Sequence, residues 1–318
     1  MLKTFKQDVI AGLTAKEKFL SSKYFYDDEG SRIFREIMAM PEYYLSNCEH
    51  EILLTQAAQI FDCLAFDQPF NIIELGAGDG TKTFNLLSYL LSKNVKFDYI
   101  PVDISQEAMN MLTKALQEKL PQLNIKPAVG DYFEVLLDLQ KTNKQQSLLL
   151  FLGGNIGNYP KKEAIELMEL FNKVMKKGDK LLVGIDLQKN PQVIYQAYSD
   201  PHGITKRFNL NLLKRINREL GASFDLNQFD FYCYYNPRNG ELFSYLVSLA
   251  AQQVSLKDSE VVFNFAKDEL IWTEQSKKYS FEEISLLAKK SDFAVEQHFL
   301  DSQHYFTDSL LSKNNFSL

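Results

Sequence analysis

Cysteine and histidine are scarce in this 318-residue sequence, and no long apolar run occurs in it. The three cysteines, Cys48, Cys63 and Cys233, are widely separated, and the four histidines share no metal-ligand spacing, so we expect neither disulfides nor a metal site. A membrane span would need about twenty consecutive apolar residues, and a signal peptide would need an apolar block near the N-terminus. Because both are absent, the sequence predicts a cytoplasmic protein that does not bind a membrane.

An excess of basic residues is also missing. The 35 Lys and Arg residues are outnumbered by 41 Asp and Glu residues, which gives a net charge of −6. A nucleic-acid binder would need clustered positive charge to neutralise phosphates, so we expect no nucleic-acid partner. Hydrophobic residues make up 45% of the chain, as in ordinary globular proteins, and the length suffices for a large core. We expect a monomer whose partner is a small molecule.

Short apolar runs alternate with longer amphipathic stretches in the central part of the chain, from about residue 70 to residue 186. Five runs are typical of strands: 71–75, 98–102, 125–129, 147–152 and 181–185. Three stretches carry apolar residues at helical spacing: 83–91, 107–116 and 162–175. Strands that alternate with helices predict a parallel sheet covered on both faces.

The flanking segments lack this alternation. We expect one helix that begins near Gly30-Ser31 and a second over residues 48–64. Two more are expected, over residues 210–220 before Gly221 and from Ser280 through Lys290. Two antiparallel strand pairs are expected, at 229–236 with 242–251 and at 294–300 with 305–312. The patterns predict an α/β fold: a Rossmann-like core with a mostly parallel sheet and a terminal antiparallel strand, plus a second α+β subdomain. We assign residues 51–187 and 279–318 to the core, and residues 1–50 and 188–278 to the subdomain.

A glycine-rich loop follows the first strand of the core, in Glu74-Leu-Gly-Ala-Gly-Asp-Gly80. Glycines let the backbone turn tightly and approach a ligand, and the free N–H groups of the following helix attract polar groups. The spacing is GxGxG and not the GxGxxG of dinucleotide dehydrogenases, and Glu74 and Asp79 disfavour a pyrophosphate. The loop therefore favours S-adenosylmethionine, held at Gly76 and Gly78; the alternative is a tight turn without a ligand.

Two acids follow the next strands. Asp103 ends the second strand, where a carboxylate can accept hydrogen bonds from both ribose hydroxyls, and Asp131 follows the third, where it can accept from the adenine amino group. Each also fits a helix N-cap, for which aspartate is favoured. With the loop, they indicate a nucleoside site.

Several further motifs together resemble the histidine-specific Nα-methyltransferases of ergothioneine biosynthesis, which are class I methyltransferases. They are Tyr24-Phe-Tyr26-Asp27, Pro41-Glu-Tyr43-Tyr44, Phe151-Leu-Gly153-Gly-Asn-Ile-Gly-Asn158, Ala197-Tyr198-Ser-Asp200-Pro-His-Gly203-Ile-Thr205 and Ile271-Trp-Thr-Glu274-Gln-Ser276. The resemblance spans nearly the whole chain. It implies three methyl transfers from S-adenosylmethionine to the α-amino group of L-histidine, which give hercynine, and a second subdomain that binds the substrate.

The resemblance also implies roles for individual residues. The expected cofactor contacts are Tyr43, Gly76, Gly78, Lys82, Asp103 and Asp131. The expected substrate contacts are Phe34, Gly153, Asn158, Tyr198, Thr205, Glu274 and Ser276. We assign the catalytic roles to Asn158, which orients the amine, and to Tyr26, which relays its proton; a water molecule is the alternative relay. The clustered aromatic residues are either a lid over the amine or part of the core.

Glu274 and Ser276 decide the substrate in this interpretation. An imidazole has two nitrogens that can donate, so a carboxylate paired with a hydroxyl is complementary to it. Residues two apart on a strand share a face, although a surface Glu274 and a turn at Ser276 are the alternative. Where the family has methionine, this sequence has Ser244, which makes that wall smaller and more polar.

Alternative functions are methylation of a tryptophan-like amino acid, a nicotinamide-dependent oxidoreductase, or a regulator that binds S-adenosylmethionine without catalysis.

Overall fold

Two compact units make up the chain in the computed structural model, which describes residues 2–257 and 259–314. The first unit comprises residues 1–44 and 189–277, and the second comprises residues 45–188 and 278–318. The sequence prediction put the first boundary at residue 50, which lies inside one helix, α3 (Tyr44–Thr55). The observed boundary therefore falls where this helix begins. The last residues of the predicted core, 315–318, lie outside the described part.

A mixed sheet forms the centre of the second unit, in the order β13-β14-β7-β6-β2-β3-β4, with β5 also paired to β3. Its strands are β2 (Phe70–Leu75), β3 (Phe97–Asp103), β4 (Asn124–Ile125), β5 (Ala128–Val129), β6 (Ser147–Phe151), β7 (Lys180–Asp186), β13 (Phe293–Leu300) and β14 (Phe306–Lys313). Strand β14 is antiparallel to β7 and to β13, whereas the pairs β2–β3, β2–β6 and β6–β7 are parallel. The predicted mostly parallel sheet with its terminal antiparallel strand is confirmed.

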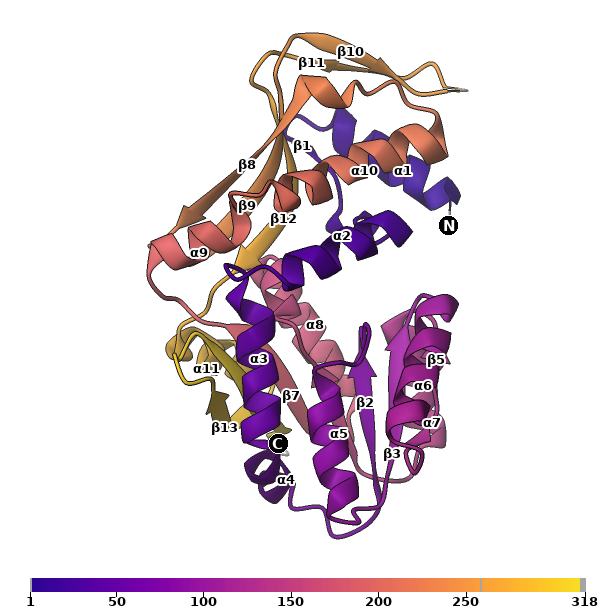
Figure 1. Cartoon of the computed structure of the whole chain (residues 1–318), viewed down its shortest axis with the longest axis vertical. Helices are drawn as coiled ribbons and strands as arrows, with labels where there is room; N and C mark the ends of the chain where they lie inside the picture. The colour runs from indigo at the N-terminus through magenta and orange to yellow at the C-terminus, as the bar shows by residue number, and fades with distance from the viewer. Residues whose placement is uncertain (1, 258, 315–318) are drawn as a thin grey trace. The chain divides into compact units, whose positions relative to one another are not determined.

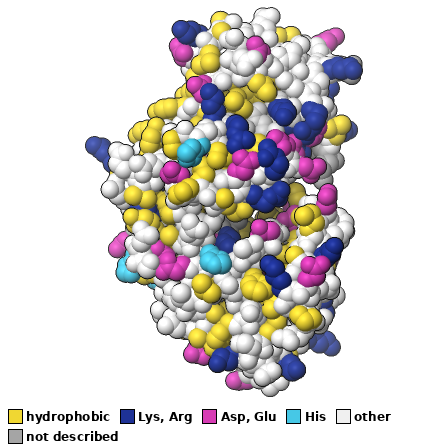
Figure 2. All heavy atoms as spheres, in the orientation of Figure 1, with side chains coloured by type: hydrophobic (Ala, Val, Ile, Leu, Met, Phe, Trp, Pro, Cys, Tyr) yellow, Lys and Arg dark blue, Asp and Glu magenta, His cyan; other side chains and the backbone are white. Residues whose placement is uncertain are grey.

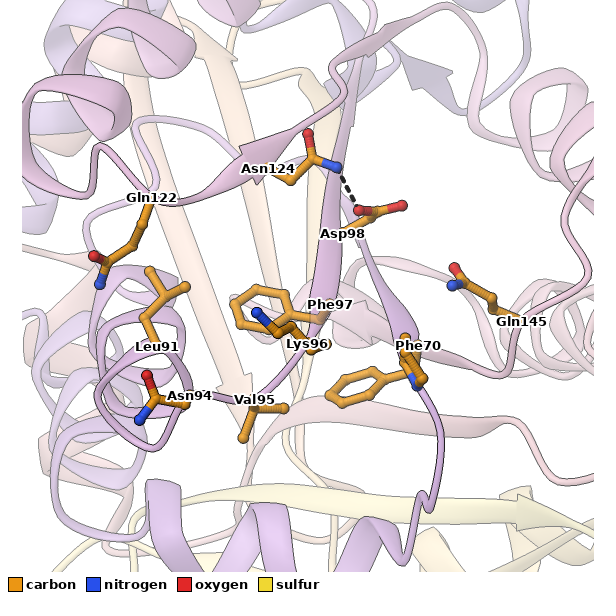
Figure 3. A pocket seen from close by; sticks show the side chains of 11 residues that line it. Phe70, Leu91, Asn94, Val95, Lys96, Phe97, Asp98, Gln122, Asn124 and Gln145 are labelled. Carbon is orange, nitrogen blue, oxygen red and sulfur yellow. Dashed lines mark hydrogen bonds between the residues drawn. The ribbon is translucent and has the colours of Figure 1, made fainter.

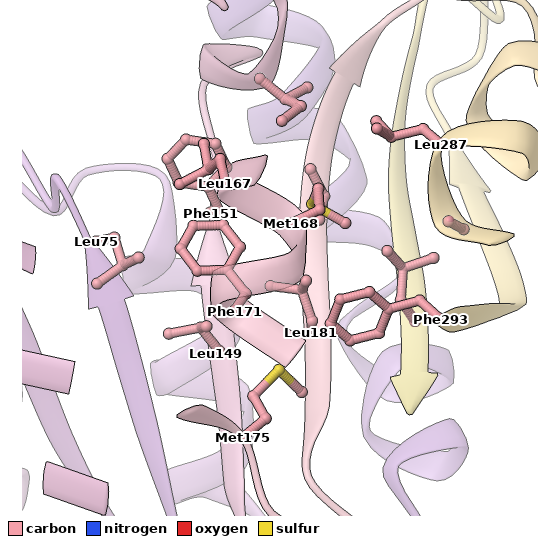
Figure 4. Close-up of a cluster of buried hydrophobic side chains, with 14 of the residues drawn as sticks. Leu75, Leu149, Phe151, Leu167, Met168, Phe171, Met175, Leu181, Leu287 and Phe293 are labelled. Atoms are coloured by element: carbon pink, nitrogen blue, oxygen red, sulfur yellow. The ribbon is translucent and has the colours of Figure 1, made fainter. Parts of the chain in front are cut away.

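Helices cover both faces of this sheet, as its apolar strands require. They are α3, α4 (Ala57–Leu64), α5 (Thr83–Ser92), α6 (Gln106–Lys119), α7 (Tyr132–Thr142), α8 (Lys161–Val174) and α11 (Phe281–Lys290), with a short 3-10 helix, η2 (Asn155–Asn158). Helices α3, α4 and α5 lie in front of the sheet in Figure 1. On the other face, Phe171 of α8 and Leu287 of α11 join Phe151 and Leu181 of the sheet in one buried cluster (Figure 4).

Local chemistry explains where the second unit departs from the predictions. The single helix expected over residues 48–64 is two helices, α3 and α4, separated at Gln56, whose side chain donates to the Leu300 carbonyl at 2.7 Å. The strand expected over 125–129 is split into β4 and β5 because Pro127 has no N–H for the ladder. Helix α7 was not predicted.

A four-stranded sheet, in the order β1-β12-β9-β8, organises the first unit. Its strands are β1 (Lys18–Phe19), β8 (Phe229–Asn236), β9 (Glu241–Ser248) and β12 (Leu270–Lys277), and β10 (Gln252–Ser255) pairs with β11 (Val262–Phe265) separately. The helices are α1 (Leu2–Thr14), η1 (Ser22–Tyr24), α2 (Asp28–Met38), α9 (Pro191–Tyr198), α10 (Ile204–Leu220) and η3 (Leu226–Gln228). The antiparallel pair predicted from the sequence is β8 with β9.

Capping carboxylates start two of these helices earlier than expected. Helix α10 begins at Ile204 and not at Leu210, because Asp200 accepts from the N–H groups of Ile204 and Thr205, both at 2.8 Å. Helix α2 follows Asp27, which accepts from Gly30 N at 2.7 Å, so Gly30 lies inside its first turn.

Charged side chains of both signs are interspersed on the face that Figure 2 shows. Several charged side chains of the first unit are paired, including Arg207 with Glu36 at 2.5 Å and Arg218 with Asp27 at 2.6 Å. Within residues 2–257 and 259–314, no helix has the length and apolar character that crossing a membrane requires.

Candidate active site

The loop after β2 keeps its backbone open to a ligand. Gly76, Gly78 and Gly80 have φ values of 66°, 57° and 69°, in the left-handed region that favours glycine. A β-carbon on Gly78 would meet no atom within 4 Å, whereas one on Gly80 would lie 2.3 Å from Leu112 Cδ1 of α6. Gly80 therefore serves packing, and Gly76 and Gly78 leave room beside the backbone at the predicted cofactor loop.

Glu74 of β2 points into the interior and not toward the loop. It is 3% exposed, and its two carboxylate oxygens accept from Thr83 Oγ1, at 2.6 Å, and from the Tyr99 hydroxyl. Burial raises the pKa of Glu74 to about 7, although both hydrogen bonds favour the carboxylate. The expectation that Glu74 helps to select a cationic cofactor is wrong, because this side chain joins β2 to β3 and to the first turn of α5.

The raised pKa of Glu74 predicts a pH-dependent stability. The folded pKa of about 7 exceeds the ordinary value of 4.5, so the folded chain retains a proton that the unfolded chain has lost. The Glu74 contribution to the free energy of unfolding should therefore fall by about 2 kcal/mol between about pH 5 and pH 7.5. Urea unfolding of wild type and of Glu74→Gln at both pH values measures this contribution, because the decrease in the variant should be smaller by about 2 kcal/mol. An equal decrease in both proteins would contradict the assignment.

Asp103 and Asp131 follow neighbouring strands, since Asp103 at the end of β3 pairs with Val129 of β5. Asp103 Oδ1 accepts from Ser105 N at 2.9 Å, and burial raises the pKa of Asp103. Asp131 Oδ1 accepts from Phe133 N at 2.9 Å, so the N-cap alternative is confirmed for Asp131. A carboxylate has a second oxygen and further lone pairs, so this cap does not prevent contact with a ligand.

Tyr132, which was not selected from the sequence, stands beside these carboxylates. Its hydroxyl lies 4.0 Å from the position of a β-carbon on Gly76. Burial, with smaller effects of Tyr159, Asp103 and Asp131, raises the pKa of Tyr132 to about 12. Tyr132 therefore adds a neutral aromatic wall to the cofactor loop.

Lys82, Gly153 and Asn158 lie at the ends of adjacent parallel strands, β2 and β6. The Lys82 ammonium is paired with Glu49 of α3, and Gly153 N donates to the same carboxylate at 2.6 Å. Gly153 has a φ of 84°, and Asn158 is half-buried at the end of η2. The sheet order reverses between β2 and β6, which is where open α/β sheets bind ligands.

The pocket in Figure 3 lies at the opposite ends of the strands, where β2 and β3 begin. Phe70 and Phe97 in its lining are the first residues of β2 and β3, and Asn124 there donates to Asp98 at 2.6 Å. The glycine loop and Asp103 follow the opposite ends of the same strands. This pocket is therefore separate from the candidate cofactor site.

A β-bulge in the first unit places Glu274 and Ser276 on one buried face of the sheet. The pairing of β12 with β9 shifts by one residue between Trp272 and Glu274, so Thr273 is the extra residue. Beyond it, Glu274 faces Ser244 and Ser276 faces Leu242, and both partners are buried. The bulge thus turns Glu274 and Ser276 toward the side that the helices cover, and Ser244 stands directly across from Glu274.

Tyr198 of α9 connects this face to an aromatic cluster. Its hydroxyl lies 2.8 Å from Ser276 Oγ, and its ring centroid lies 6.2 Å from that of Tyr43. Phe34 packs 6.3 Å from Tyr43 and 5.4 Å from Tyr26. Phe208 contacts both Tyr26 and Phe34, while Thr205 is buried one turn earlier on α10. The first unit therefore collects Tyr26, Phe34, Tyr43, Tyr198 and Ser276 in one connected array.

Comparison with known proteins identifies the family. The model of the family described as "Histidine-specific methyltransferase, SAM-dependent" matches residues 5–313. The chain belongs to this family.

Histidine N-alpha-methyltransferase of Mycolicibacterium smegmatis is 32% identical over 303 residues, with 95% of this chain and 91% of that protein covered. The Mycobacterium tuberculosis protein of the same name is 32% identical over 274 residues, covering 86% of this chain and 84% of its own length. Ergothioneine biosynthesis protein 1 of Schizosaccharomyces pombe is 29% identical over 283 residues, covering 87% of this chain and 36% of that protein.

As a member of the histidine-specific methyltransferase family, the chain is an enzyme that uses S-adenosylmethionine. The second unit offers chemistry that fits this cofactor: open backbone at Gly78, carboxylates at Asp103 and Asp131, and the aromatic Tyr132. No group of three or more His, Cys, Asp or Glu side chains suited to a metal ion occurs among the described residues.

Proposed function

We propose that this methyltransferase transfers three methyl groups to the α-amino nitrogen of L-histidine, which gives hercynine and begins ergothioneine biosynthesis. Membership of the family and the names of the two mycobacterial relatives support this substrate. The name of the fission-yeast relative supports the pathway. We further propose a monomer in the cytoplasm, as expected from the sequence.

The arrangement of Glu274, Ser276 and Tyr198 is the observation that carries the choice of histidine. Glu274 and Ser276 share the bulged strand, and the Tyr198 hydroxyl meets Ser276 Oγ at 2.8 Å. An imidazole can donate one hydrogen bond to a carboxylate and share another with a hydroxyl. A half-buried carboxylate beside a buried hydroxyl would be left poorly satisfied by an apolar side chain, which favours histidine over it.

Asn158, Gly153 and Tyr26 would prepare the amine for attack. S-adenosylmethionine supplies the methyl group as an electrophile on a positively charged sulfur. An amine attacks only as the neutral base, so each of the three transfers requires the loss of one proton first. We assign orientation of the amine to Asn158 and the Gly153 peptide, and transfer of the proton to bulk water to Tyr26. Alignment of the reacting atoms then lowers the barrier without a covalent enzyme intermediate.

Replacement of Tyr26 by phenylalanine tests the proton relay. The Tyr26 ring is exposed and packs against Phe34, and phenylalanine preserves that ring while it removes the hydroxyl. We expect the methylation rate near neutral pH to fall by about tenfold to a hundredfold, and the loss to shrink as alkali deprotonates the amine. Rates measured between about pH 6 and pH 9 check this expectation. A variant with the full rate over that range would exclude Tyr26 as the relay and favour water.

Methylation of a second aromatic amino acid is the other candidate. Ser244 stands across from Glu274, where a small side chain leaves room for a ring larger than imidazole. Mass spectrometry of an amino acid panel incubated with enzyme and S-adenosylmethionine separates the candidates. A gain of three methyl groups on histidine supports the proposal, and methylation of tryptophan without histidine rejects it.

A further inference from the structure

Buried charge collects beneath the loops that follow β2 and β6 in the second unit. Glu49 of α3 is fully buried, and its two carboxylate oxygens take separate partners. Oε1 accepts from Gly153 N at 2.6 Å, and Oε2 is paired with the Lys82 ammonium. Since Lys82 follows the glycine loop and Gly153 opens the loop after β6, one side chain joins two loops at adjacent strand ends.

The surrounding chain leaves space for this carboxylate. A β-carbon on Gly184 of β7 would lie 2.1 Å from Glu49 Oε1. Gly184 is not one of the glycines with a left-handed backbone, so steric room and not conformation requires glycine there. The Leu152–Gly153 peptide is also held from its other side, because Asn155 Nδ2 donates to the Leu152 carbonyl at 2.8 Å. The orientation of this peptide is therefore fixed on both sides.

A second acid, Asp308 of β14, faces the same charges. It pairs with Gly184 across the strands and is fully buried, and neither carboxylate oxygen has a hydrogen-bond partner among the described residues. Burial and the nearby Glu49 raise the pKa of Asp308 far above its usual range, against the opposing effect of Lys82. Two acids therefore face one ammonium, and Glu49 is the one that forms the ion pair with Lys82.

We propose that Glu49 is a positioning residue for methyl transfer, which holds the Lys82 ammonium and the Gly153 peptide in one fixed arrangement. The inference rests on the proposed function, in which the Gly153 peptide orients the amine, and on the cofactor contact that the family resemblance implies for Lys82. A buried ion pair adds little net stability, because the cost of desolvating both charges offsets their attraction. The held geometry gives Glu49 a role beyond folding, because small misplacements of reacting groups cost much of the rate.

Glu49→Gln tests this role, with Glu51→Gln as the matched control. Glutamine preserves the shape of the side chain and removes its charge, whereas Glu51 lies on the same helix and accepts from Ser302 N at 2.9 Å. We expect Glu49→Gln to weaken the binding of S-adenosylhomocysteine by about tenfold and to lower kcat roughly a hundredfold. Calorimetry gives the affinity, and its stoichiometry counts folded sites, so that kcat refers to folded enzyme only. Glu51→Gln should leave both quantities unchanged.

Unchanged affinity and kcat in folded Glu49→Gln would overturn the proposal. If that variant does not fold, Glu49→Asp decides by the same criteria, because it keeps the charge but cannot reach both partners. Wild-type enzyme that binds S-adenosylhomocysteine and leaves histidine unmethylated would instead reject the proposed function. The affinity of the Glu49 variants would still decide the positioning role in that case.

Discussion

Alanine in place of Glu274 is expected to weaken histidine binding by roughly a hundredfold. A hydrogen bond to a charged group contributes about 1.5 to 3 kcal/mol, and each 1.4 kcal/mol corresponds to about tenfold in affinity. The bulge at Thr273 directs the half-buried Glu274 to the face of the sheet that carries Ser244, where loss of the carboxylate would leave the imidazole without its acceptor. Calorimetric titration of histidine into enzyme saturated with S-adenosylhomocysteine measures the effect.

Glu241→Gln is the matched control for this experiment. Glu241 lies on the neighbouring strand β9 and pairs with Lys277, on the face opposite to Ser244 and Glu274. Removal of its charge should leave the histidine affinity unchanged. Glu274→Gln, which keeps one acceptor oxygen, should fall between wild type and Glu274→Ala. Wild-type affinity in Glu274→Ala would refute the imidazole pocket while leaving the cofactor assignment intact.

Replacement of Asp103 by asparagine should weaken cofactor binding by about a hundredfold. Two ribose hydroxyls need two acceptors, and the amide nitrogen of asparagine is a donor, so one of the two contacts is lost. Asparagine keeps an oxygen that can accept from Ser105 N, so the turn after β3 should persist. Calorimetry with S-adenosylhomocysteine measures the affinity, and methylation at saturating cofactor should recover most of kcat.

Asp98→Asn, on the same strand, separates a ribose contact from a general effect on β3. Asp98 binds Asn124 Nδ2 and the Lys126 ammonium, both at 2.6 Å, near the start of the strand. Its replacement should lower stability slightly and leave cofactor affinity unchanged. Equal losses of affinity in the two variants would show that Asp103 acts through the strand and not through the ribose.

Features that depend on local sequence were predictable. The apolar runs of β2, β3, β6 and β7 are buried almost throughout, so composition alone marks them as strands of a covered sheet. The glycine loop was predictable because three positions with a left-handed backbone favour three glycines. The terminal antiparallel pair was also visible, since alternation and turn residues are local signals.

Features that depend on distant partners were not predictable in the same way. Glu49 looks like an ordinary helix residue until folding brings Lys82 and Gly153 to it. Glu74 stands beside the glycine loop in the sequence, but its carboxylate accepts hydrogen bonds from Thr83 and Tyr99 in the interior. Tyr132 was not selected from the sequence, and only packing places it beside the candidate contacts.

The extra residue in β12 decides which face of the sheet Glu274 and Ser276 occupy. Ile271 and Glu274 share a face only because Thr273 adds one step to the alternation. Without it, Gln275 and Lys277 would take the inner side, and the same Glu-x-Ser letters would face outward. A sequence that lacks one residue just upstream could therefore keep the Glu-x-Ser motif and present both side chains on the outer face. In the proposed pocket, the number of residues after the preceding apolar position, and not the motif alone, therefore decides whether Glu274 and Ser276 can reach the imidazole.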